Sequence, residues 1–143
     1  MKSKEYLSQA RYLDMRIKSK VQQIESLNEL ATSCSSAITG MPRNPNKGGS
    51  RMADAVCKII DLQTELNADI NSLVDLKRDI MRTIRSVAND EYQTLLEKRY
   101  LCFLSWEKIA VEMHYSIQHI YRMHDEALTE VNVLLTMRGN ESD

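Results

Sequence analysis

The stretch LSWEKIAVEMHYSIQHIYRMHDEAL, residues 104–128, predicts two short helices that meet at a tight corner. Ser105 and Ser116 are placed to cap these helices, because a serine hydroxyl accepts hydrogen bonds from backbone N–H groups that a helix start leaves unpaired. Ala110 lies on the inner face of the first helix, where a small side chain lets the two helix axes approach closely. Such a corner is typical of a helix-turn-helix, in which the first helix braces the second.

A further helix is predicted before this corner, with Asn89 or Asp90 as its N-cap. The three helices form a predicted module over residues 89–137, and residues 138–143 form a frayed polar tail. The helices are expected to run to about Phe103, to Met113 and to about Thr136. Their apolar positions recur at helical spacing and are expected to face inward: Leu95, Leu96, Tyr100, Leu101, Trp106, Ile109, Ala110, Met113, Ile120, Met123, Ala127, Leu128 and Val131.

Residues 1–88 carry two long amphipathic segments whose seam positions alternate spacings of four and three, as in a coiled coil. Lys20, Gln63 and Lys77 are polar breaks in these seams. The first segment, Ser3 to Ile38, has its seam at Tyr6, Ala10, Leu13, Ile17, Lys20, Ile24, Leu27, Ala31, Cys34 and Ile38. The second, about Arg51 to Val87, has its seam at Met52, Val56, Ile59, Gln63, Leu66, Ile70, Leu73, Lys77, Ile80, Ile84 and Val87.

The intervening GMPRNPNKGGS, residues 40–50, predicts a loop in which Gly40 ends the first helix and Ser50 caps the second. Two helices joined in this way predict an antiparallel hairpin. Because two helices cover only part of each other's apolar stripe, we expect homo-oligomerisation through the hairpin, with a dimer favoured. The loop is basic, through Arg43, Lys47 and Arg51, so it is either a solvated tip or an arm that contacts phosphates.

Composition places the chain in the all-α class, because its 143 residues include only four glycines and two prolines. No run of about 18 apolar residues and no apolar signal region occurs, so we expect a cytoplasmic protein without a membrane partner. Cys34, Cys57 and Cys102 form no metal pattern and are expected to be reduced, buried thiols.

Enzymatic chemistry is not indicated. The three histidines, His114, His119 and His124, recur every five residues, whereas metal ligands on one helix face recur every three or four. Phosphate-binding glycine loops and hydrolase motifs are absent from the sequence. We therefore expect a protein that is not an enzyme and that holds no cofactor and no metal.

The residues from Leu95 to Leu128 resemble the region 4 helix-turn-helix of bacterial sigma factors. The matching residues are Arg99-Tyr100, Ser105-Trp106-Glu107-Lys108-Ile109-Ala110, Ser116 and Ala127-Leu128. The whole chain, with its hairpin first and its sigma-like module last, resembles small phage and prophage proteins grouped with the RinA and ArpU types of transcriptional activator. The chain departs from the sigma pattern at His114, where glycine is usual. It also departs on the reading helix, where the sigma pattern usually has several arginines or lysines and this chain has only Arg122.

The resemblance implies that Ile117, Gln118, Tyr121 and Arg122 contact bases in double-stranded DNA. Arginine pairs with guanine O6 and N7, glutamine pairs with adenine N6 and N7, and apolar groups contact the thymine methyl. Four further residues are expected to approach backbone phosphates: Ser105, Lys108, His119 and His124.

The net negative charge of residues 90–143 lowers the expected affinity for DNA, because this segment contains ten acidic and only five basic side chains. Two modules tethered in one dimer would add their contacts. We expect a sequence-specific, DNA-binding transcription regulator of phage type that acts as an oligomer. Two alternatives stay open: a module that binds RNA polymerase or another regulator without reading DNA, and a small phage DNA-packaging subunit.

Overall fold

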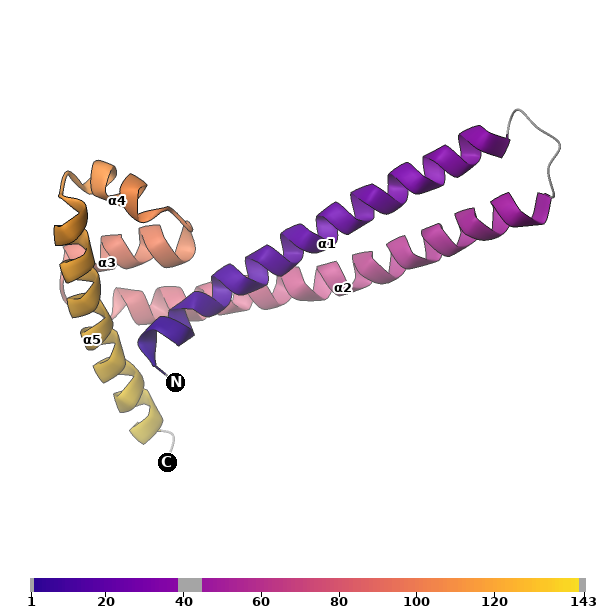
Figure 1. Cartoon of the computed structure of the whole chain (residues 1–143). Coiled ribbons are helices and arrows are strands. Elements are labelled where there is room, and N and C mark those ends of the chain that lie inside the picture. The colour runs from indigo at the N-terminus through magenta and orange to yellow at the C-terminus, as the bar shows by residue number, and fades with distance from the viewer. Residues whose placement is uncertain (1, 39–44, 142–143) are drawn as a thin grey trace. The chain divides into compact units, whose positions relative to one another are not determined.

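The computed structural model describes the backbone of residues 2–38 and 45–141 and the side chains of residues 2–33 and 51–140. In these ranges the chain is helical, with short connections and no strand, which confirms the all-α class. Figure 1 labels the α-helices along the chain. They are α1 (Ser3–Ile38), α2 (Pro45–Arg85), α3 (Asp90–Leu96), α4 (Trp106–Met113) and α5 (Ile117–Glu141), and a short π-helix, η1 (Glu97–Leu101), follows α3.

The helix starts follow local capping chemistry in most places. The Asn89 side chain accepts hydrogen bonds from the backbone N–H groups of Glu91 and Tyr92 and caps α3. The predicted cap of α2 is wrong, because this helix begins at Pro45 and Ser50 lies inside it. Proline suits a first helical position, since its fixed φ is helical and its missing N–H would be unpaired there anyway. The predicted cap Gly40 lies outside the described residues.

The carboxyl-terminal helix is longer than the sequence pattern indicated. Helix α5 continues past Thr136 to Glu141, so it includes most of the segment that was predicted to be a frayed tail. Arg138, inside that segment, donates a hydrogen bond to the Thr83 hydroxyl at 2.9 Å and pairs with Asp79 at 3.2 Å. These contacts with α2 are formed only in the folded chain, and they favour helix in the last turns of α5.

The chain divides into two compact units. Unit 1 combines residues 1–13 with residues 73–143, and unit 2 is Asp14–Ser72. The domain boundary predicted between residues 88 and 89 falls inside unit 1, because the ends of α1 and α2 belong to the same unit as the carboxyl-terminal helices.

In unit 2, α1 and α2 lie side by side and run in opposite directions. The polar break at Lys20 is accounted for here, since its ammonium lies 2.5 Å from a carboxylate oxygen of Asp69 and 3.5 Å from one of Glu65. The predicted α1 seam is half-buried throughout this unit, as far as its side chains are described: Ile17, Lys20, Ile24, Leu27 and Ala31.

The predicted α2 seam needs correction in unit 2, because alternate positions of it are exposed. Val56, Gln63 and Ile70 point to solvent, and neighbouring residues take their places. The observed seam keeps the alternating spacing but shifts to one side of the helix: Met52, Ala55, Ile59, Leu62, Leu66 and Asp69. The shift places Asp69 opposite Lys20, and it leaves Val56, Ile60 and Ile70 as an exposed apolar stripe beside the seam.

Unit 1 has an apolar core to which every one of its long helices contributes. One cluster joins the first turns of α1, the last turns of α2 and the residue Val87 after it to α3, η1 and α5: Leu7, Ala10, Ile80, Ile84, Val87, Leu96, Tyr100, Ala127 and Val131. A second cluster joins α3, α4 and α5 through Leu95, Ile109, Ala110, Ile120 and Met123. All inward residues that the sequence predicted for α4 and α5 are buried or half-buried.

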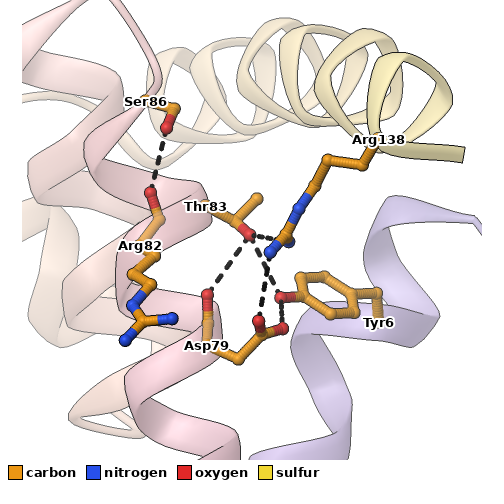
Figure 2. A network of polar contacts seen from close by, with 6 residues as sticks. All are labelled: Tyr6, Asp79, Arg82, Thr83, Ser86 and Arg138. Carbon is orange, nitrogen blue, oxygen red and sulfur yellow. Dashed lines mark hydrogen bonds and ion pairs between the residues drawn. The ribbon is translucent and has the colours of Figure 1, made fainter. Parts of the chain in front are cut away.

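A polar network closes one side of this core (Figure 2). The Tyr6 hydroxyl donates to a carboxylate oxygen of Asp79 and lies 3.1 Å from the Thr83 hydroxyl. Arg138 reaches the same two α2 residues from α5. The hydrogen bond from Tyr6, followed by the bond and charge of Arg138, holds the pKa of the Asp79 carboxyl below its usual range despite partial burial. The network therefore fixes α1, α2 and α5 to one another within unit 1.

Candidate nucleic-acid interface

Two serine caps define the corner between α4 and α5, as the sequence predicted. The Ser105 hydroxyl accepts a hydrogen bond from the Lys108 backbone N–H at 3.3 Å. The Ser116 hydroxyl accepts one from the His119 backbone N–H at 3.2 Å. Each serine thereby satisfies a donor that the first turn of its helix leaves unpaired. Both helices consequently start at the residues that the sequence indicated, Trp106 and Ile117.

The corner contains a residue with a left-handed backbone conformation, His114. His114 has φ 61° and ψ 39°, and its N–H bonds to the carbonyls of Ala110 and Val111. The N–H of Tyr115 also reaches the Ala110 carbonyl, at 3.1 Å, and so completes the end of α4. Glycine is the residue that adopts this backbone at least cost, whereas His114 has a Cβ that crowds the following carbonyl.

Replacing His114 with glycine is expected to stabilise the fold by about 0.5–1 kcal/mol. The relief of left-handed strain, roughly 1–2 kcal/mol, is larger than the entropy that glycine adds to the unfolded chain. Urea unfolding at neutral pH measures the change. His114→Ala serves as the control, because alanine keeps the Cβ. Equal stability of the two variants would show that the left-handed turn is not strained.

The amino-terminal turns of α5 present an exposed face next to the corner. Gln118, Tyr121 and Arg122 are exposed, and Ile117 is half-buried at the edge of this face. The Tyr121 ring meets the edge of the Trp106 ring with centroids 5.5 Å apart, so it is anchored against α4. Asp125 is also exposed, one turn beyond Tyr121 and Arg122, and adds a negative charge.

The residues predicted to approach phosphates differ in their exposure to solvent. Lys108 is exposed on α4, and Ser105, whose hydroxyl caps the same helix, is exposed as well. His119 is half-buried, with its ring 4.5 Å from the ring of Tyr115. His124 is buried, with only 6% of its surface exposed, so its predicted approach to a phosphate is wrong.

His124 belongs to the core because its position on α5 faces α4 and η1. Its Nε2 lies 2.6 Å from the Tyr100 hydroxyl, and its ring is 4.5 Å from that of Trp106. Burial lowers the pKa of His124 to about 4, and burial raises the pKa of Tyr100 to about 12. At neutral pH the phenol and the imidazole are therefore both uncharged, and the imidazole tautomer sets which of them donates the hydrogen bond.

Sequence reasoning missed the π-helix η1, which follows α3 without a break. Here the Cys102 N–H bonds to the carbonyl of Glu97, five residues back, and the left-handed Phe103 (φ 59°) ends the turn. Lys77 of α2 binds the Leu101 carbonyl at 3.2 Å, with its ammonium 4.7 Å from the centre of the Phe103 ring. The sequence offers no glycine or asparagine to mark this turn. Single π-turns are frequent at functional sites.

An acidic groove lies on another side of the corner. Its volume is about 320 Å³, and it is lined by Asp90, Glu91, Thr94, Lys98, Glu112, Met113 and Tyr115. Lys98 pairs with Glu112 at 3.1 Å, and the Tyr115 hydroxyl donates to Glu91 at 2.7 Å. Asp90 has no such neutralising partner in the described part of the chain, so the groove keeps a net negative charge.

The remaining predictions concern thiols, metals and membranes. Cys57 and Cys102 are exposed, so the expectation of buried thiols is wrong for both, and the Cys34 side chain is not described. Within residues 2–38 and 45–141, His, Cys, Asp and Glu nowhere form a group of three or more that could hold a metal ion. Over the same ranges, each helix lacks the long apolar stretch that a bilayer crossing requires.

Comparison with known proteins gives one family. Residues 35–132 match the model of a family described as "Protein of unknown function (DUF1492)". Because the match spans more than half of the 143 residues, the chain belongs to this family. The comparisons with curated proteins and with solved structures returned no match.

Proposed function

We propose that this member of the DUF1492 family is a sequence-specific DNA-binding transcription regulator of phage type that acts as a homo-oligomer in the cytoplasm. One observation carries the proposal: Gln118 and Arg122 stand exposed on the amino-terminal turns of α5, directly after a capped corner with α4. The resemblance of the same residues to sigma factor region 4, and of the chain to the RinA and ArpU types, agrees with it.

The geometry of α5 suits a reading helix. A major groove admits one α-helix, and helix-turn-helix proteins contact bases from the amino-terminal turns of the second helix. Gln118 and Arg122 are four residues apart and therefore lie on one face. Their amide and guanidinium groups each make paired hydrogen bonds to purine edges. Tyr121 and Ile117 supply apolar surface beside them for a thymine methyl.

Charge favours an oligomer over a monomer for this function. The few cations at the corner, among them Lys108 and Arg122, neutralise few phosphates, so counterion release contributes little to affinity. Two tethered modules would bind one DNA molecule with a high effective concentration for the second contact. The exposed stripe of Val56, Ile60 and Ile70 in unit 2 supports this step, because a second copy would remove it from water.

The decisive test is selection of bound sequences from a random DNA pool, followed by measurement of the Arg122→Ala variant. The variant is expected to lose about 1–3 kcal/mol of discrimination at one base position while its affinity for other sequences changes little. Arg78→Ala is the matched control, because Arg78 is an exposed arginine of α2 outside the corner. If both variants retain the wild-type sequence preference, Arg122 does not read a base.

A second candidate function is a protein-interaction module that binds RNA polymerase or another regulator. The acidic groove with Asp90, Glu91 and Glu112 favours this alternative, because it suits a basic partner surface. Binding that depends on salt and requires the partner protein, with no DNA selected from the pool, would support it. The third candidate, a DNA-packaging subunit, would be supported by ring-shaped assemblies of many copies in solution.

A further inference from the structure

A small cavity in unit 1 is lined by residues from the first turns of α1, from η1 and from the start of α4. Its volume is about 70 Å³, and its lining residues are Lys4, Ser8, Arg11, Arg99, Tyr100 and Trp106. A water molecule occupies about 30 Å³ in the liquid, so the space suits a group of a few heavy atoms. We propose that this cavity binds a phosphate group.

The lining of the cavity is positively charged. Lys4, Ser8 and Arg11 are spaced by four and three residues and therefore share one face of α1. Within the described residues the cavity is lined by three cations and by no carboxylate. In the same part of the chain, neither the Lys4 ammonium nor the Arg11 guanidinium has an ion pair or hydrogen bond.

Unpaired cations that line one cavity repel one another, and this repulsion affects the pKa values of groups beside them. The charge of Arg11, after burial, lowers the pKa of Arg99, and the charges of Lys4 and Arg99 add to the burial that lowers the pKa of His124. Asp125 opposes the effect on the pKa of His124, and Glu107 opposes the effect on the pKa of Arg99, but neither carboxylate lines the cavity. An anion between the three cations would relieve their repulsion.

The side chain of Arg99 is oriented by two contacts that leave most of its N–H donors available for such an anion. Its NH1 donates to the Leu104 carbonyl at 2.9 Å, and its guanidinium carbon lies 4.4 Å from the centre of the Trp106 ring. These contacts fix the plane of the guanidinium, which has five N–H donors and uses one of them on Leu104. The π-turn of η1 positions Arg99 beside Trp106. We infer that this placement of Arg99 is the structural role of the π-turn.

The donor set selects phosphate among anions. A guanidinium binds phosphate through two parallel N–H···O bonds, and the ammonium and hydroxyl groups can reach further oxygens of a tetrahedral group. Such a group comes either from the DNA backbone or from a small phosphate compound. The lining adjoins α4, beside Ser105 and Lys108, which are expected to approach phosphates if α5 reads DNA. Binding of a small phosphate does not depend on that function.

The test uses the full-length protein and its single tryptophan, Trp106, as an internal probe. Inorganic phosphate is titrated at constant ionic strength with chloride as the balancing anion, and the emission of Trp106 is recorded. We expect a saturable change with phosphate that chloride does not produce. Arg11→Glu is expected to weaken it at least ~10-fold, since charge-assisted hydrogen bonds contribute more than 1.4 kcal/mol, the equivalent of tenfold.

Arg16→Glu is the matched control, because it makes the same charge change at an exposed α1 residue that does not line the cavity. It should keep the wild-type phosphate midpoint. Thermal unfolding of both variants checks that the fold is intact, and Lys4→Gln provides a milder second variant. The proposal is overturned if phosphate gives no saturable change in the wild type, or if Arg11→Glu and Arg16→Glu behave alike.

Salt-dependent DNA binding then identifies the source of the phosphate. If the backbone of DNA occupies the cavity, Arg11→Glu should weaken binding to all sequences uniformly and reduce the salt slope by about 1 or more relative to Arg16→Glu. If the two variants bind DNA alike while phosphate binding is lost only in Arg11→Glu, the site takes a small phosphate compound. Absence of DNA binding would remove the proposed function and leave the fluorescence result unaffected.

Discussion

Replacing both Ile60 and Ile70 with aspartate is expected to dissociate the proposed oligomer and to weaken specific DNA binding by about 100-fold or more. Both side chains are exposed in unit 2, where 55% of Ile60 and 41% of Ile70 remain accessible. A buried interface does not tolerate an unpaired carboxylate, and loss of the second tethered module removes an avidity of roughly 10²–10⁴. Sedimentation velocity and DNA titration at one fixed salt concentration measure the two effects.

Val133→Asp is the control for this change, because Val133 is 55% exposed on α5 and lies outside the stripe of α2. It should leave the sedimentation coefficient unchanged. Far-UV circular dichroism separates dissociation from unfolding. A wild-type protein that sediments as a monomer at micromolar concentration would count against the oligomer, as would a double variant that keeps its wild-type size.

Acidification from pH 7.5 to pH 5.0 is expected to lower the free energy of unfolding by about 2 kcal/mol through His124. Burial depresses its folded pKa from 6.5 to about 4, so the unfolded chain binds a proton more readily than the folded one. Stability is therefore complete above pH 6.5 and is lost as the pH falls toward 4; the difference at pH 5 follows from these two values. Urea unfolding at both pH values measures it.

His124→Gln should remove most of this pH dependence, because glutamine does not titrate and can still hydrogen-bond the Tyr100 hydroxyl. His114→Gln is the control, since His114 is exposed and its loss leaves the effect in place. Asp79 does not interfere in this window. Its pKa is lowered from 3.8, so its contribution is present above about pH 4 and is lost at lower pH. A wild-type protein equally stable at pH 7.5 and pH 5.0 would contradict the burial of a neutral imidazole.

The corner illustrates how much of a site local sequence can specify. Ser105 and Ser116 act through hydrogen bonds to N–H groups three residues ahead, so their role is visible without any knowledge of the fold. The same holds for the cap of α3, for which the sequence left Asn89 and Asp90 as alternatives and the structure has Asn89. The outward position of Gln118 and Arg122 follows from helical spacing, although their predicted contact with bases stays a prediction. The left-handed turn at His114 was indicated only by the resemblance to the sigma pattern, in which glycine is usual at this position.

Other features depended on residues far apart in the chain. The α1 seam was predicted correctly in its described part, but the α2 seam was not. Val56 and Ala55 are both apolar, so the sequence pattern did not distinguish the two helix faces, whereas in the structure Ala55 is buried and Asp69 pairs with Lys20. His119 and His124 are both histidines of α5, so the sequence alone does not show which of them is buried. In the structure, α4 and η1 cover His124.

By itself, the sequence determined the all-α class, the starts of α3, α4 and α5 and the inward residues of α4 and α5, because caps and periodicity act over a few residues. Only the tertiary structure decided the face of α2 that pairs with α1, the burial of His124 and the π-turn that carries Arg99. It also gathered Lys4, Arg11 and Arg99 around one cavity, although some 90 residues of chain separate Arg99 from the other two. The physical reason is that these features arise from packing and electrostatics between distant segments, which no local pattern encodes.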